Sequence, residues 1–179
     1  MDLNLLNCLC NLHIQKSTYQ LLFLNYYFNT QQDIMEKNIT FTPLYTAKVM
    51  GTSGRDGHVK SSDGVIDLDV RLPKGMGGDE TGKHTNPEQL FAAGYAACFG
   101  GALSAIAKNK KIKLTSPPEV TVHATFGKEG DGFGLAVDIF VHISDMEISE
   151  VQSLTEAAHQ ICPYSKATRG NIPVNIHVN

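Results

Sequence analysis

The chain has 179 residues, of which 42% are hydrophobic and 18% charged, and its formal net charge is −3. This balance indicates one globular domain with its own core and excludes a fibrous or low-complexity chain. The charge leaves no basic surplus for phosphate groups, so nucleic acid is not an expected partner. The four cysteines, at positions 8, 10, 98 and 162, are too widely spread for a disulfide scaffold or a structural zinc site, which favours a cytoplasmic location and no metal.

Residues 1–34 differ in composition from the rest, because Leu, Asn, Tyr and Gln dominate them. They lack the charged start, the apolar run and the cleavage site of a signal peptide. Met35 then opens a stretch typical of the start of a cytosolic protein. We therefore expect residues 1–34 to be an extension, either disordered or produced by a misassigned start site, and residues 35–179 to form the functional domain.

Three short β-prone segments follow, at residues 44–49, 57–61 and 65–70. Turns rich in Gly and Asp separate them, so they predict an antiparallel meander. The next segment, residues 73–85, is a glycine-rich loop. It lacks the Gly-Lys-Ser/Thr ending of a phosphate-binding loop, which argues against a nucleotide cofactor.

A long helix is predicted to begin at Asn86, with Asn86 as its cap and Pro87 in the first helical position. Gln89 is placed to form the reciprocal hydrogen bond to the cap residue. Residues 89–107 carry no charge, which raises the alternative of a membrane span. The run consists of Ala and Gly more than Leu and Ile, and strand-like segments flank it. We therefore favour a central helix buried in its own protein and expect no membrane partner.

The last third of the chain predicts a hairpin, a second helix and a final strand. Residues 120–126 and 134–143 are strand-like and are joined by a turn-rich segment. Ser149 is predicted to cap a helix that ends at Cys162, and residues 174–178 form a last strand. The order of elements predicts an α+β domain with antiparallel sheets packed against a long central helix and a second helix.

Cys98 and Cys162 are the candidates for redox chemistry. Cys98 lies in the middle of the long helix, where a lone cysteine is most simply a small core residue. Cys162 lies at a helix end directly before a proline, so its side chain can reach a neighbour. The two are a plausible attacking and resolving pair, in which a thiolate forms a sulfenic acid and a second thiol closes a disulfide.

An attacking thiolate needs a cation, and a cysteine in mid-helix gains little from the helix dipole. Arg55, in a turn able to fold over the helix, is the natural candidate, although a solvated turn residue is the simpler interpretation. Glu88, in the first turn of the long helix, is placed to hold such an arginine by a bidentate ion pair. The helix dipole favours an acidic residue there in any case.

Three motifs stand in order along the chain: GRDGHVKSSDG around Arg55, TNPEQLFAAGYAACFGGAL around Cys98 and ICPYSKATRGNIPV around Cys162. Together they resemble the organic hydroperoxide resistance proteins of the wider osmotically inducible protein C family, over about residues 35–179. The resemblance implies an intertwined homodimer with two active sites at the subunit interface. It also implies that alkyl and fatty-acid hydroperoxides are the substrates and that a dithiol, such as a lipoylated protein, is the reductant.

The same resemblance assigns a role to each site residue. Cys98 is the peroxidatic cysteine, Cys162 the resolving one, Arg55 the activating cation and Glu88 the partner that orients Arg55. We expect a thiol peroxidase of the oxidative stress response that needs no cofactor. Two alternatives stay open: a redox sensor that signals through its disulfide, and a ligand-binding module whose cysteines are inert.

Overall fold

The computed structural model describes residues 41–79 and 82–179. The chain divides into two compact units, residues 1–46 and 47–179, and every helix and strand described here belongs to the second unit. The predicted extension, residues 1–34, lies outside the described residues.

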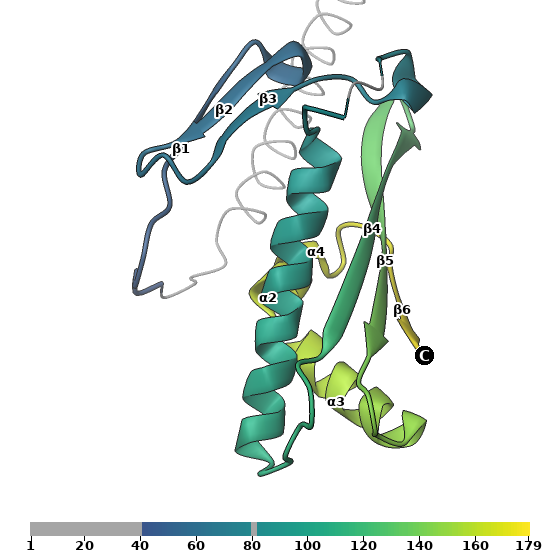
Figure 1. The fold of residues 1–179 in the computed structure, drawn as a ribbon. Helices are drawn as coiled ribbons and strands as arrows, with labels where there is room; N and C mark the ends of the chain where they lie inside the picture. Colours follow the sequence, from purple (N-terminus) through teal and green to yellow (C-terminus); the bar gives the residue numbers. More distant parts are fainter. Residues whose placement is uncertain (1–40, 80–81) are drawn as a thin grey trace, which may run out of the picture. The chain divides into compact units, whose positions relative to one another are not determined.

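The first sheet is the predicted antiparallel meander of β1 (Val49–Thr52), β2 (Gly57–Ser61) and β3 (Asp67–Val70), in that order (Figure 1). Its first strand begins five residues later than the predicted segment 44–49. The reason is the tight turn between β1 and β2, where Ser53 and Gly54 both adopt left-handed backbone angles. This turn reverses the chain so that the four residues directly before it pair with β2.

The long helix α2 (Pro87–Asn109) begins as predicted. The Asn86 side chain accepts a hydrogen bond of 2.8 Å from the backbone N–H of Gln89. The Gln89 side chain accepts a bond from the Thr85 hydroxyl, at 3.0 Å, in place of the expected reciprocal one. By length and composition alone α2 resembles a membrane span, a test that the core helix of a soluble protein also passes. It packs against β4 and α3 of the same unit.

The second sheet contains β4 (Glu119–Glu129), β5 (Gly132–His142) and β6 (Val174–Val178). β4 and β5 form the predicted antiparallel hairpin, whereas β6 pairs with β5 in parallel. A parallel neighbour needs a long crossover, which α3 (Ile148–Ile161) and α4 (Pro163–Thr168) provide.

One predicted detail of this crossover was wrong. Ser149 does not cap α3, because the Glu147 carbonyl already accepts from the backbone N–H groups of Glu150 and Val151. The helix ends at Cys162 as predicted, and a further helix follows at once, because Pro163 takes the first position of α4, where a missing N–H costs nothing.

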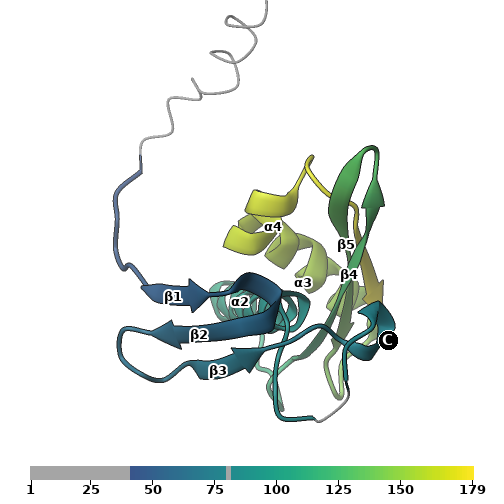
Figure 2. The ribbon, with the colours of Figure 1, turned by 90° about the horizontal axis from the view of Figure 1, so that it is seen from above.

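The core lies where α2 and α3 cover one face of the second sheet (Figure 2). Its largest fully buried side chains include Tyr95, Phe99 and Leu103 of α2 and Leu154 of α3. By contrast, the first sheet buries only Val70 among its strand residues. The predicted α+β class, with a long helix against antiparallel strands, is confirmed.

Candidate active site

The structure brings Cys98 and Cys162 into contact. The Cys162 thiol donates to the Cys98 sulfur at a distance of 3.7 Å between sulfur atoms. Both are free thiols; Cys162 is fully buried and Cys98 partly exposed. Two residues 64 positions apart thus meet where the α3–α4 junction crosses α2.

The Cys-Pro sequence itself explains where Cys162 points. A proline disfavours helical angles in the residue before it, and Cys162 is accordingly extended, with φ −61° and ψ 123°. The backbone bends at this residue but stays bonded on both sides: its N–H donates to the Ala158 carbonyl, and its own carbonyl accepts from the N–H of Lys166. The side chain is therefore held at a fixed corner between two helices.

The surroundings of Cys98 act on its pKa in opposite directions. Burial is the largest effect and raises the pKa of the Cys98 thiol, because it disfavours the charged thiolate. The neighbouring Cys162 raises it further, since two thiols in contact do not both ionise readily. The backbone N–H of Tyr164 donates to the Cys98 sulfur and opposes them, but the net shift is upward.

Arg55 and Glu88 form the predicted bidentate ion pair. The two guanidinium nitrogens donate to the two carboxylate oxygens at 2.9 and 2.6 Å. Arg55 lies in the short turn Gly54–Asp56, and its guanidinium also covers the ring of Phe126 at 4.6 Å from the ring centre. The pair lowers the pKa of Glu88 and raises that of Arg55, chiefly through these hydrogen bonds.

The ion pair and the thiol pair are not joined. In residues 41–79 and 82–179, no hydrogen bond or ion pair links Arg55 to Cys98. Glu88 and Cys98 are ten residues apart on α2, which is about 15 Å along the helix axis. Arg55 is therefore bonded to Glu88 and Cys98 to Cys162, but the cation makes no hydrogen bond to the thiol that it was predicted to activate.

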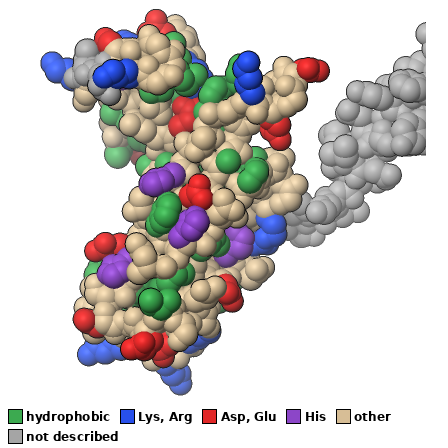
Figure 3. Space-filling view, turned by 90° about the vertical axis from the view of Figure 1, so that its right-hand side faces the viewer, with side chains coloured by type: hydrophobic (Ala, Val, Ile, Leu, Met, Phe, Trp, Pro, Cys, Tyr) green, Lys and Arg blue, Asp and Glu red, His purple; other side chains and the backbone are tan. Residues whose placement is uncertain are grey.

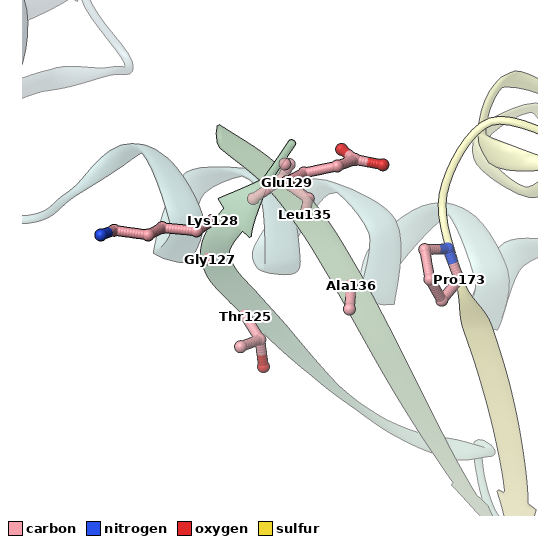
Figure 4. Close-up of a pocket in the computed structure, with 8 residues that line it drawn as sticks. Thr125, Gly127, Lys128, Glu129, Leu135, Ala136 and Pro173 are labelled. Atoms are coloured by element: carbon pink, nitrogen blue, oxygen red, sulfur yellow. The ribbon is translucent and has the colours of Figure 1, made fainter. Parts of the chain in front are cut away.

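A cavity of about 430 Å³ lies beside the ion pair. Glu88 lines it together with apolar side chains, among them Ala92, Val122 and Phe126. A second recess, of about 210 Å³, lies at the far end of the β4–β5 hairpin beside Pro173 and contains none of the predicted site residues (Figure 4).

Histidine side chains gather on one face of the molecule (Figure 3). His123 packs against Phe140, the Phe140 ring stacks on His177, and His142 bonds to the carbonyl of Asn179. No group of three or more His, Cys, Asp or Glu in the described part of the chain could hold a metal ion.

Sequence reasoning missed two residues that touch the predicted ones, Phe126 and Tyr164. Tyr164 follows Cys162 by two positions, so its nearness was readable from the sequence. Phe126 was not, because a strand pattern does not say which loop lies over a side chain.

The fold and the site define an α+β protein in which two distant cysteines meet as free thiols at a helix junction. Residues 78–177 match the family model described as OsmC-like protein. The chain is 47% identical over 135 residues to the organic hydroperoxide resistance protein OhrB of Bacillus subtilis, covering 75% of this chain and 98% of that relative.

Two solved structures are similarly close. An organic hydroperoxide resistance protein from Elizabethkingia anophelis is 48% identical with a TM-score of 0.72, over 78% of this chain and 99% of that one. One from Legionella pneumophila is 40% identical with a TM-score of 0.72, over 77% and 99%. The chain therefore belongs to the osmotically inducible protein C and organic hydroperoxide resistance family.

Proposed function

We propose that the protein is a cysteine-based peroxidase that reduces organic hydroperoxides to alcohols. The observation that carries the proposal is the contact of 3.7 Å between the sulfur atoms of Cys98 and Cys162. Two free thiols at this distance need only a small movement to form a disulfide. Inert core cysteines would not need to lie in contact with each other. The names of the similar proteins support organic hydroperoxides as the substrate class.

The proposed reaction has two steps within the protein. The Cys98 thiolate attacks one peroxide oxygen; an S–O bond forms, the O–O bond breaks, and the released alkoxide takes a proton to become the alcohol. The Cys162 thiol then attacks the Cys98 sulfenic acid, an S–S bond forms and water leaves. An external dithiol, for which we propose a lipoylated protein, reduces the disulfide by thiol exchange. No cofactor is needed.

Arg55 is assigned the role of activating cation and Glu88 that of its orienting partner. Because burial raises the pKa of Cys98, a positive charge near the sulfur is required to favour the thiolate. Arg55 has a side chain about one third exposed and lies on a short turn, so it can change its direction without unfolding a strand. The apolar side chains that line the cavity beside Glu88, among them Val122 and Phe126, would suit the organic part of the substrate.

We further propose that residues 35–179 act as an intertwined homodimer in the cytoplasm, with residues 1–34 as an extension outside the catalytic domain. Exposed apolar surface supports a partner subunit: Val49 and Met50 of β1 are 51% and 63% exposed. One side of α2 is likewise uncovered and carries small residues, among them Ala93 and Ala97.

The test is consumption of cumene hydroperoxide by the purified protein with a dithiol reductant, with hydrogen peroxide measured in parallel. Cys98→Ser should abolish turnover, whereas Cys162→Ser should allow one oxidation and then stall. A variant with Cys8 and Cys10 replaced by Ser is the control and should keep full activity. A wild-type protein that consumes no peroxide while both thiols stay free would instead favour a ligand-binding module.

A further inference from the structure

A buried hydrogen-bond network fastens the α3–α4 junction to α2. The Tyr95 hydroxyl lies 3.0 Å from the Ser165 hydroxyl and 3.2 Å from that of Thr168. The Ser165 hydroxyl also lies 3.0 Å from Nδ1 of His159. Tyr95 and Ser165 are fully buried, and Thr168 is 6% exposed. The network therefore links all three helices through three buried hydroxyl groups and the half-buried His159.

Residues of this network lie on both sides of Cys162 in the chain and one helical turn before Cys98. Tyr95 precedes Cys98 by three residues on α2, so the two side chains lie on neighbouring positions of one helix face. His159 precedes Cys162 by three residues, and Ser165 follows it by three. The bond between His159 and Ser165 thus spans the bend that contains Cys162, and the bond to Tyr95 ties that bend to the helix of Cys98.

The position of this bend is critical for the second step of the proposed reaction. A disulfide has its sulfur atoms about 2.05 Å apart, so the observed 3.7 Å must shorten by about 1.7 Å. Reacting atoms need to come within about 3–3.5 Å, and a misplacement of about 1 Å can slow a reaction by about 100-fold. A small outward drift of the α3–α4 junction would therefore delay the disulfide.

We infer that Tyr95 and Ser165 are positioning residues for the resolving step: their hydrogen bond keeps Cys162 within reach of oxidised Cys98. The inference rests on the proposed peroxidase function. Two reactions compete for the Cys98 sulfenic acid. Attack by the Cys162 thiol gives the disulfide and water, whereas a second hydroperoxide transfers its oxygen to give the sulfinic acid and an alcohol. The network decides which reaction is faster.

The hydroxyl of Tyr95 can be removed without removing its ring. The ring packs against those of Phe91, Phe99 and Tyr164 and would stay in place in Tyr95→Phe. Ser165 keeps His159 as a partner in that variant, so no buried hydroxyl loses every bond. The chain also offers a matched control, Thr155→Val, because the buried Thr155 hydroxyl on α3 has no hydrogen-bond partner.

The experiment follows one turnover. Reduced wild type, Tyr95→Phe, Ser165→Ala and Thr155→Val are each mixed with cumene hydroperoxide, quenched at intervals, and analysed by intact mass for thiol, disulfide and sulfinic acid. We expect the rate at which the Cys98 thiol is lost to be within twofold of wild type in all three variants. Disulfide formation should be at least tenfold slower in the first two variants, with more sulfinic acid, and unchanged in Thr155→Val.

Disulfide formation by diamide is measured in the same proteins, because it needs the two thiols to meet but no peroxide chemistry. The same tenfold delay is expected there. If wild type fails to react with peroxide but Tyr95→Phe still delays the diamide reaction, the peroxidase proposal fails and the positioning role survives.

Disulfide formation at the wild-type rate in Tyr95→Phe would overturn the inference. So would equal slowing of thiol loss and disulfide formation in that variant, or slower disulfide formation in Thr155→Val. Where Ser165→Ala does not fold, Thr168→Val removes the other partner of Tyr95 and is expected to give the same delay.

Discussion

Oxidation of the reduced protein is expected to raise its stability, because Cys98 and Cys162 are 64 residues apart in the chain and 3.7 Å apart in space. A cross-link over a loop of this length removes about 4 kcal/mol of chain entropy from the unfolded state. Part of this gain is offset by the movement that brings the sulfur atoms to bonding distance. We therefore expect a net stabilisation of about 2–4 kcal/mol, the usual range for a disulfide.

The assay is urea unfolding of the oxidised and the reduced protein at one protein concentration, because the stability of the proposed dimer would depend on concentration. With a slope of about 2 kcal/mol per molar urea, the midpoint should rise by about 1–2 M on oxidation. Cys162→Ser treated with the same oxidant is the control and should not shift. An oxidised wild type that contains the bond but is no more stable than the reduced form would refute the reasoning, because the native positions of the two thiols would then be incompatible with a bond.

Three further outcomes are expected. Glu88→Gln should cost about 1 kcal/mol at pH 7, a value reduced for the partial exposure of Arg55. Because the pKa of Glu88 is lowered in the folded state, the ion pair stabilises the protein above the ordinary carboxyl pKa, and this stabilisation is lost as the pH falls through the folded value. The melting temperatures of variant and wild type should therefore converge in acid, and a difference that does not change with pH would contradict the pairing. Gly57→Ala should lower the free energy of unfolding by about 2–3 kcal/mol and disrupt the Arg55 turn, because its Cβ would lie 1.7 Å from a backbone carbonyl oxygen. Gly51→Ala is the control and should melt like wild type, because the nearest atom to its Cβ would be 3.8 Å away. Phe126→Leu should slow the first oxidation by about two- to fivefold through the lost cation–π contact of about 0.5–1 kcal/mol, measured by stopped-flow kinetics; an unchanged rate would separate Phe126 from the function of Arg55.

Local sequence signals determined most of the secondary structure. The cap at Asn86 with Pro87 set the start of α2, and two strand-like runs joined by a turn-rich segment set the β4–β5 hairpin. Sequence signals failed to predict an element correctly where its position depends on a contact far away in the chain, or where a backbone group takes the place of the expected side-chain cap. The parallel pairing of β6 with β5 depends on how α3 and α4 pack, which no residue of β6 encodes. The start of α3 depends on backbone hydrogen bonds from Glu147, which the Ser149 pattern did not show.

For the site, sequence patterns identified the four candidate residues and two local causes of their placement. Pro163 bends the chain at Cys162, and the first turn of α2 presents Glu88 to a cation. The packing of elements far apart in the chain brings the two sulfur atoms together, and it pairs Arg55 with Glu88 with no hydrogen bond from Arg55 to Cys98. It also decided that the pKa of Cys98 is raised, because burial is a property of the whole packed unit and not of the residues beside Cys98 in the chain.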